Sequence, residues 1–432
     1  MKRPLVIKFG GTSVGEGAAF SRAARIAAEA AQNGPVAVVV SAMAGTTDVL
    51  LGLARATAGP APRTSTGGTC EGSLAEIYRS LADRHLRAAC KAVPEDLLSE
   101  VEERLQTILD RLAEAVDAPA VNPVARRDAI ASFGERLSAE ILAGAIAGLG
   151  APAATVAGDP IATNGVFGEA EVLAGETRRR AGRYVRPLLD LGTVAVVPGY
   201  VGRTPDGSVT TLGRGGSDLS ATVLGRALGA TEVWVMSDVD GVLDADPALI
   251  PGAQLIPHLS YREAAQFAAL DAEVLHPKTT APAAAAGITV RVRSTFNPDS
   301  PGTRISDCEG GPGVRSVALR RGLSLTHVTP EAAESAFCVL GTGAAGLEAL
   351  VKGAGVAAVV CIGASTDEDL LTGLRCLHGV GVRPVWAGNT STGLLFAIAE
   401  GSAELALRTL HTGLVREASG SGAVSGAARE VA

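Results

Sequence analysis

The chain has 432 residues, 47% of them hydrophobic and 19% charged, which is enough for two or three globular domains and too apolar for a disordered protein. The formal net charge of −7 argues against a nucleic-acid partner, and we expect no membrane partner because no secretory leader and no run of about 18 apolar residues occurs. Six cysteines without a C-x-x-C pair or zinc spacing predict no metal site, reduced and mostly buried thiols, and a cytoplasmic location.

The first third of the chain predicts the start of a parallel α/β sheet. Residues 4–9 form a short apolar run that ends in glycines, residues 17–33 have apolar residues at helical spacing, and residues 36–43 are again apolar. Unbroken apolar runs are typical of central strands in parallel sheets. Residues 48–148 are mainly helical in pattern, with a Pro-, Gly- and Ser-rich loop expected at 59–73.

The sheet pattern then resumes and ends at a domain boundary. Strands are expected at 153–158, 193–202, 232–242 and 288–296, with helices at 219–228, 259–270 and 278–287. Ser260 and Glu263 form the sequence pattern of a capping box. We predict an open, mostly parallel sheet with helices on both faces over 1–305, a linker at 306–313, small α+β modules over 314–420 and a flexible tail at 421–432.

Two glycine turns follow apolar strands and carry cations. In the first, Lys8 precedes Gly10 and Gly11, which fits neither the Walker loop nor the dinucleotide fingerprint. In the second, Arg214 lies within the glycines of "GRGG", and Ser217 and Asp218 follow. Ligands of open parallel sheets bind beyond the carboxyl ends of strands, so the pair of turns predicts an anion or phosphate site.

Other motifs have a structural explanation as well as a functional one. The loop "SDVDGVLDADP" at 237–247 could be a solvated or self-bonded aspartate-rich turn, and it lacks the glutamate of a calcium loop. Glu135 alone would be a surface carboxylate, and His276 a helix-boundary or core histidine. The G-x-G-x-x-G at 341–346 is followed by too little chain for a dinucleotide domain.

Taken in order, the motifs resemble the aspartokinases of the amino-acid kinase superfamily. "VIKFGGTSV", "SFGERLSA", "TLGRGGSDLSA", "SDVDGV" and "VLHPKT" carry the resemblance, which covers roughly residues 4–305. It implies the amino-acid kinase fold, C-terminal ACT-like (ferredoxin-like) regulatory modules, and the reaction of ATP with L-aspartate to 4-phospho-L-aspartate, with Mg²⁺ on the phosphates. It also implies a homodimer or higher oligomer through the C-terminal region.

The resemblance assigns a role to each matching position. Lys8 and Asp218 are the expected catalytic residues. The aspartate would be bound by a second group: Ser41, Thr47, Glu135 for the α-ammonium, Arg214 for the α-carboxylate, and Ser217. ATP would be bound by a third group: Lys8, Gly10, Gly11, Ser237, Asp238, Asp246 and, as a replacement cation, Lys278.

The departures from the family pattern lie on the nucleotide side and in the regulatory region. Ala248 and Glu273 stand where the family has an arginine and a lysine, and Leu243 stands where it often has a tyrosine. "TPEAAESAF" replaces a glycine-rich effector loop, which predicts weak or absent inhibition by lysine or threonine.

Two other functions stay open at this point. The chain could phosphorylate a different acidic amino acid in a specialised pathway, because the same residues suit any α-amino acid with a side-chain acid. It could also be a nucleotide-poor regulatory or binding homologue, which the three nucleotide-side departures favour.

Overall fold

The computed structural model describes residues 2–57, 70–118, 122–269, 277–308, 313–323, 356–384, 386–390 and 393–416. The chain divides into two compact units, and each is described here by itself. The first unit comprises Met1–Gly241 and Val274–Asp307, and the second comprises Val242–Glu273 and Cys308–Ala432. The segment 242–273 therefore belongs to the same unit as the C-terminal region. A single boundary after residue 305 would place this segment in the first unit instead.

A twisted sheet forms the centre of the first unit. Its strands follow the spatial order β3-β4-β2-β1-β7-β9-β10. All neighbouring pairs in this order are parallel except β9 and β10. The open, mostly parallel sheet predicted from the sequence is confirmed. The strands are β1 (Leu5–Phe9), β2 (Val36–Val40), β3 (Ala153–Thr155), β4 (Val194–Pro198), β7 (Glu232–Ser237), β9 (Thr289–Ser294) and β10 (Thr303–Ser306).

Side chains of β1 alternate between two helical layers, as the period of two requires. Val6 points towards helix α9 (Gly216–Leu228). A Cβ added to Gly225 of this helix would lie 3.9 Å from Val6 and only 2.7 Å from Val233 of β7. Ile7 and Phe9 belong to the apolar cluster on the other face. Lys8 shares the face of Val6, so the alternation directs its side chain towards α9.

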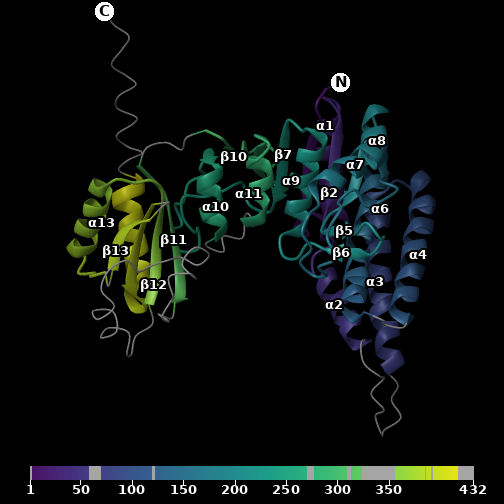
Figure 1. Cartoon of the computed structure of the whole chain (residues 1–432), viewed down its shortest axis with the longest axis horizontal. Helices are drawn as coiled ribbons and strands as arrows, with labels where there is room; N and C mark the ends of the chain where they lie inside the picture. The colour runs from purple at the N-terminus through teal and green to yellow at the C-terminus, as the bar shows by residue number, and fades with distance from the viewer. Residues whose placement is uncertain are drawn as a thin grey trace, which may run out of the picture. The chain divides into compact units, whose positions relative to one another are not determined.

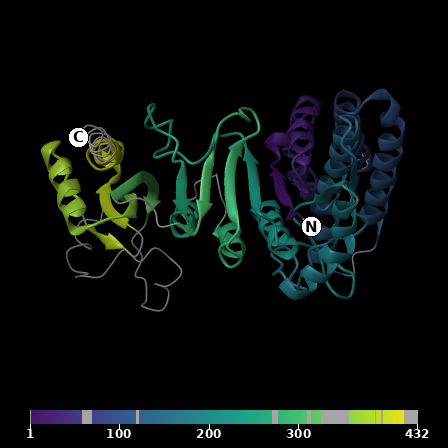
Figure 2. The same cartoon turned by 90° about the horizontal axis from the view of Figure 1, so that it is seen from above.

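Helices cover both faces of this sheet (Figure 1). The helical hairpin of α3 and α4 packs against α6, and the blue helices lie side by side in both views (Figure 2). The helices of this unit are α1 (Gly17–Ala31), α2 (Thr46–Ala56), α3 (Cys70–Ala92), α4 (Glu95–Asp117), α5 (Pro123–Ala131), α6 (Phe133–Ala147), α7 (Ala174–Tyr184), α8 (Arg186–Asp190), α9 and α11 (Pro277–Ala284). A hairpin of β5 (Val201–Arg203) and β6 (Val209–Thr211) leads into α9.

The second unit contains a four-stranded antiparallel sheet in the order β11-β12-β14-β13. Helices α13 and α14 pack on it through Leu377, Leu407 and Leu410, which meet Val359 and Phe396 in one apolar cluster. This α+β arrangement agrees with the expected ACT-like module. Its elements are β8 (His258–Ser260), α10 (Tyr261–Ala269), β11 (Gly313–Leu323), β12 (Val356–Ala364), α13 (Asp367–Gly379), β13 (Trp386–Thr390), β14 (Gly393–Ala399) and α14 (Ala403–Leu410).

The structure confirms one local prediction and corrects two others. The capping box of α10 is confirmed, because the Glu263 carboxylate accepts from the Ser260 N–H at 2.7 Å and the Glu263 N–H donates to Ser260 Oγ at 3.1 Å. The loop predicted at 59–73 is too long, since α3 begins at Cys70. The thiols are not mostly buried: Cys361 is buried, but Cys90 and Cys308 are exposed.

Some sequence predictions lie outside the described residues. They include Glu273, His276, the "TPEAAESAF" segment, the G-x-G-x-x-G at 341–346 and the tail at 421–432. None of the described helices is long and apolar enough to cross a membrane.

Candidate active site

The candidate site lies at the carboxyl end of the central strand β1. The chain runs from β1 to β2 on one side and returns later to β7 on the other, which is the kind of switch point where open α/β sheets bind ligands. Lys8 Nζ lies 2.6 Å from the Asp218 carboxylate in the first turn of α9, and both side chains are largely buried, at 12% and 16% exposure. The structure thus joins the two predicted catalytic residues as an ion pair.

The two glycines after β1 make room for this pair and for a neighbouring loop. A Cβ added to Gly10 would lie 3.2 Å from Lys8 Nζ, and one added to Gly11 would lie 3.1 Å from the carbonyl oxygen of Ala42. The Gly11 carbonyl accepts a hydrogen bond from the Ala44 N–H at 3.2 Å. Glycine therefore eases the close approach of the loop after β1 to the loop after β2.

The predicted substrate residue Ser41 belongs to that second loop, and Thr47 lies in the first turn of α2, which follows it. The Ser41 N–H donates to the Phe9 carbonyl at 3.0 Å, which ties the ends of β2 and β1 together. From α3, Arg84 donates to the Ala44 carbonyl at 2.7 Å and to the Gly15 carbonyl at 3.3 Å. Arg84 holds both loops in place, a role that no local sequence pattern indicates.

Glu135 is buried in α6, so the surface carboxylate suggested by its sequence context is wrong. It is 3% exposed, and one carboxyl oxygen has no hydrogen-bond partner among the described residues. Burial raises the pKa of Glu135 from 4.5 to about 8, and the N–H groups of Glu135 and Ala42 and the charge of Arg136 offset only part of the shift. A buried carboxyl with an open oxygen suits a cationic ligand.

The second glycine turn presents Arg214 and Ser217. Gly213 and Gly215 have φ of 74° and 72°, in the left-handed region that glycine adopts readily, and the exposed Arg214 lies between them. Ser217 lies against the end of β4, because a Cβ on Gly199 would be 2.9 Å from the Ser217 hydroxyl. Ser217 and Asp218 both lie in the first turn of α9, beside the end of β1.

Tyr200 and Asp128 were missed by the sequence analysis. Among the described residues, Tyr200 is the one non-glycine residue with a positive φ, which is 64°. This conformation costs on the order of 1–3 kcal/mol. Burial raises the pKa of its phenol, and the charges of Glu135 and Asp128 add to the shift, so the ring lies near both carboxyls. The tyrosine within "VPGYVG" was visible in the sequence, but its backbone angle was not.

Asp128 is a buried carboxylate that fixes the backbone around the second turn. At 1% exposure, its Oδ2 accepts hydrogen bonds from the Gly168 N–H at 2.7 Å and the Thr211 N–H at 2.9 Å. Thr211 ends β6, just before the turn that carries Arg214. Asp128 is therefore a positioning residue for this backbone, and no local sequence pattern indicates that role.

The predicted nucleotide-side residues are distributed over both compact units. Ser237 ends β7 in the first unit, and its hydroxyl donates to Asp238 at 3.0 Å. Asp246 belongs to the second unit, where its carboxylate accepts the Ala248 N–H at 2.8 Å. The neighbouring Asp244 lies 3.2 Å from the buried His411. The turn is thus self-bonded in part, and the nucleotide role of Asp246 stays a prediction.

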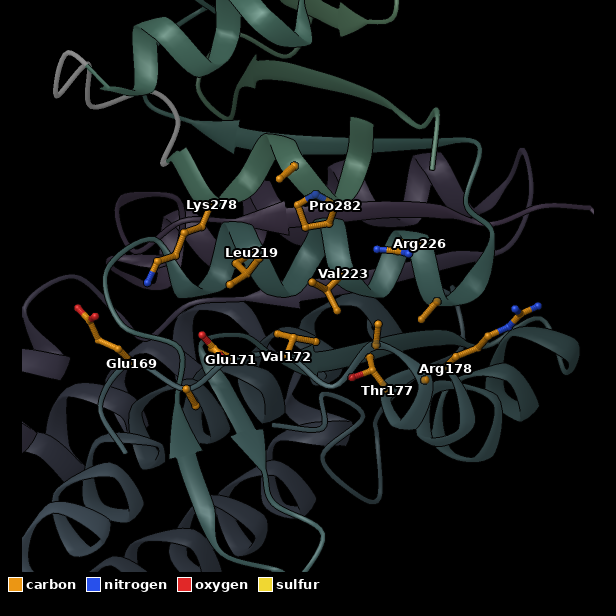
Figure 3. Close-up of a pocket in the computed structure, with 15 residues that line it drawn as sticks. Glu169, Glu171, Val172, Thr177, Arg178, Leu219, Val223, Arg226, Lys278 and Pro282 are labelled. Atoms are coloured by element: carbon orange, nitrogen blue, oxygen red, sulfur yellow. The ribbon is translucent and has the colours of Figure 1, made fainter. Parts of the chain in front are cut away.

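Lys278 lies in the first turn of α11 and lines a groove of about 680 Å³ between α7, α9 and α11. Figure 3 shows Lys278 and Glu169 at one end of the groove and Arg178 and Arg226 at the other. Leu219 and Val223 of α9 form its apolar floor. The groove runs along α9 from Leu219 in its first turn to Arg226 and Ala227 near its end.

The described residues contain no group of three or more His, Cys, Asp or Glu side chains arranged to hold a metal ion. Asp218 is nevertheless a partly exposed carboxylate beside Lys8. A Mg²⁺ ion that is bound mainly by nucleotide phosphates and water needs only one or two protein carboxylates. The donor set therefore fits such an ion.

Comparisons with known proteins place this geometry in a family context. The amino acid kinase family matches residues 3–294. The lysine-sensitive aspartokinase 3 of Escherichia coli is 34% identical over 327 residues, covering 75% of this chain and 69% of that protein. The chloroplastic aspartokinase 3 of Arabidopsis thaliana is 33% identical over 334 residues, but the match spans only 58% of its length.

Solved structures agree over nearly the whole chain. Aspartokinase III of Escherichia coli in complex with lysine and aspartate has a TM-score of 0.75 at 26% identity, covering 96% of this chain and all of that one. The same enzyme in complex with aspartate and ADP has a TM-score of 0.71, also at 26% identity, and 95% of this chain is covered.

Proposed function

Because the chain belongs to the amino acid kinase family, and within it to the aspartokinases, we propose that it transfers the γ-phosphoryl group of ATP to the β-carboxylate of L-aspartate. The observation that carries the proposal is the Lys8–Asp218 pair, 2.6 Å apart at the end of the central strand. It provides a fixed cation where donor phosphate and acceptor carboxylate must meet.

The chemistry asks for charge compensation more than for proton transfer. The acceptor is already an anion at neutral pH, since an aspartate side chain has a pKa near 3.9. Two anions must approach in line, and a preorganised cation lowers the cost of bringing them together. Asp218 holds the ammonium of Lys8 in position, and Gly10 and Gly11 bring backbone N–H groups close to the transferred phosphoryl oxygens.

The aspartate is oriented by residues around the two loops. Glu135 offers its open oxygen to the α-ammonium, and Arg214 offers a guanidinium fork to the α-carboxylate. Ser41, Thr47 and Ser217 bind the remaining oxygens. Asp218 would hold a bound Mg²⁺ ion, which would supply charge neutralisation for the nucleotide phosphates.

ATP is the proposed nucleotide, with Ser237, Asp238, Asp246 and Lys278 on its side of the site. Ala248, Leu243 and Glu273 favour a second candidate, a homologue that binds nucleotide poorly. The intact Lys8–Asp218 pair supports the active kinase instead.

A hydroxamate assay with ATP and a panel of amino acids tests the proposal. Aspartyl hydroxamate above background is the expected result. Turnover with another acidic amino acid and not with aspartate would replace the substrate, and no turnover, with ligand-dependent stabilisation in a thermal melt, would favour the regulatory homologue. The same assay on Asp218→Asn checks that product depends on the ion pair.

We further propose that lysine and threonine inhibit weakly or not at all, because "TPEAAESAF" replaces the effector loop. More than half of the activity without inhibitor should remain at about 1 mM lysine or threonine, a concentration at the upper end of ordinary metabolite affinities. Strong inhibition at that concentration contradicts the proposal.

We propose a homodimer or higher homo-oligomer through the C-terminal region. Strands β11 and β13 are the edges of the four-stranded sheet, and an open edge can pair with a second copy. Light scattering coupled to gel filtration measures the oligomeric state. A cytoplasmic location stays a prediction.

A further inference from the structure

A second hollow of about 710 Å³ lies on the first unit, beside the end of β3 and helix α7. Its walls carry six guanidinium groups and two carboxylates, a formal excess of four positive charges. Lys8, Glu135 and Asp218 are not among its lining residues, so it is separate from the candidate active site. The arginines are Arg111, Arg136, Arg179, Arg180, Arg183 and Arg203.

Three of the arginines build a fixed wall. Asp159, 6% exposed, is held by Arg136 at 3.0 and 3.1 Å and by Arg203 at 2.7 Å. Arg180 binds Glu176 at 3.1 Å, and it also donates to the carbonyls of Arg203 at 2.9 Å and Thr204 at 3.1 Å. These contacts use both carboxylates of the hollow and make its shape independent of a ligand.

The other three arginines are exposed and have fewer carboxylate partners than positive charges. Arg179 shares Glu176 with Arg180. Arg111 and Arg183 are exposed, and within the described part of the chain neither forms an ion pair. The guanidinium of Arg183 lies over the ring of Tyr184, 5.3 Å from its centroid. The rim therefore offers cations in excess, one of them, Arg183, backed by a flat aromatic ring.

Gly158 admits Tyr184 into the wall. A Cβ at Gly158 would lie 2.9 Å from the Tyr184 ring, so a larger residue would push the ring away. The ring and the clamped arginines give the hollow a rigid lining, in contrast to a loose cluster of surface cations. Rigid, convergent polar groups distinguish a binding site from a solvated charged face.

We propose that this hollow binds a small anion that carries at least two phosphate groups. Guanidinium groups match phosphate oxygens in a bidentate way, and several converging arginines select for multiple charges. The volume lies in the range of about 300–1,000 Å³ that is usual for small-molecule sites. A phosphate chain at the rim would meet Arg111, Arg179 and Arg183, which come from two different helices.

Isothermal titration of the full chain with inorganic tripolyphosphate tests the proposal. The candidate active site is first filled with L-aspartate and a non-hydrolysable ATP analogue, so that the probe reports the second site. Arg111→Gln with Arg183→Gln is the test variant. Arg55→Gln with Arg79→Gln is the matched control, with the same change of charge at two exposed arginines outside the hollow.

We expect one tripolyphosphate per chain, bound at least tenfold more weakly by the test variant and less than twofold more weakly by the control. No binding by the native chain, or equal weakening in both variants, would overturn the proposal. So would citrate that binds as tightly as tripolyphosphate, since the site would then select carboxylates. If ADP competes with tripolyphosphate, the natural ligand is a nucleotide. If ADP does not compete, the natural ligand is a phosphate compound without a base.

The measurement does not depend on catalysis. If the chain proves not to phosphorylate aspartate, the two double variants still differ in tripolyphosphate affinity. Circular dichroism of both variants checks that the fold is retained. Failure of this proposal and failure of the proposed function therefore give different results.

Discussion

The acceptor side and the nucleotide side of the proposed site differ in how the fold constrains them. On the acceptor side, Lys8, Ser41, Glu135 and Asp218 belong to one compact unit, and each is fixed by strand ends, glycine contacts or burial. On the nucleotide side, Ser237 and Asp238 belong to the first unit and Asp246 to the second. Two departures from the family pattern, Leu243 and Ala248, belong to the second unit.

The difference indicates where sequence change is tolerated. A residue in the acceptor side has several packed neighbours, so its replacement disturbs more than one contact. The nucleotide-side loop is bonded to itself and to its own unit, as for Asp246 with Ala248 and Asp244 with His411. We therefore expect changes such as Ala248 and Leu243 to leave the contacts of Lys8 and Asp218 in the first unit undisturbed.

Replacement of Lys8 should have the largest effect. Lys8→Met removes the cation between donor and acceptor, and we expect kcat to fall about 10²–10³-fold, as for loss of one preorganised charge-stabilising group. Steady-state kinetics by the hydroxamate assay measures it. Asp218→Asn removes the other charge of the ion pair. If both variants kept a kcat close to that of the native chain, the acceptor side would not be the more constrained side of the proposed site.

Glu135 should control aspartate affinity through pH. Its pKa of about 8 means that it is mostly protonated at pH 7, and binding of an α-ammonium requires the carboxylate. The KM for aspartate should therefore fall as pH rises from 6.5 to 8.5. Glu135→Gln should raise KM about 10- to 100-fold, equivalent to one charged hydrogen bond, and abolish this pH dependence.

The same residue gives a stability prediction of defined sign. Between pH 4.5 and 8 the folded chain keeps a proton on Glu135 that the unfolded chain has released, so the free energy of unfolding falls as pH rises through this window. Glu135→Gln escapes this loss and should be more stable at pH 8, by a few kcal/mol at most. Urea unfolding at pH 5 and pH 8 measures it, and equal pH dependence in both proteins would contradict the assignment.

Gly10→Ala should change the position of the Lys8 ammonium without lowering the stability of the fold. The new Cβ lies 3.2 Å from Lys8 Nζ, so the flexible ammonium must shift while the backbone can stay in place. We expect kcat to fall about tenfold, the cost of a small misplacement of a catalytic group, with little change in melting temperature. Gly52→Ala is a control, because a Cβ there has nothing within 4 Å.

Lys278→Ala should have the smallest effect of these variants. If Lys278 replaces a missing family cation, its loss raises the KM for ATP roughly 3- to 10-fold, as for one solvent-screened charge contact. The KM for aspartate should not change. An unaltered KM for ATP would show that Lys278 does not bind ATP, although it lines the groove along α9. The missing family cation would then have no replacement at this position.

The sequence by itself determined the parts that depend on neighbours in the chain. Unbroken apolar runs identified β1, β2 and β4, and the glycines identified turns at strand ends. Lys8 and Asp218 could be placed near each other because carboxyl ends of parallel strands and the helix that follows lie at one edge of a sheet. The capping box of Ser260 and Glu263 was also local, and it was confirmed.

Only the tertiary structure decided the properties that arise from packing. The burial of Glu135 and its raised pKa depend on residues that are distant in sequence, and helix α6 alone suggests an exposed carboxylate. The positive φ of Tyr200, the hydrogen bonds that Asp128 accepts from two distant backbone segments and the convergence of six arginines on one hollow are likewise invisible in any short window. Burial and convergence result from contacts across the chain, and no local pattern records them.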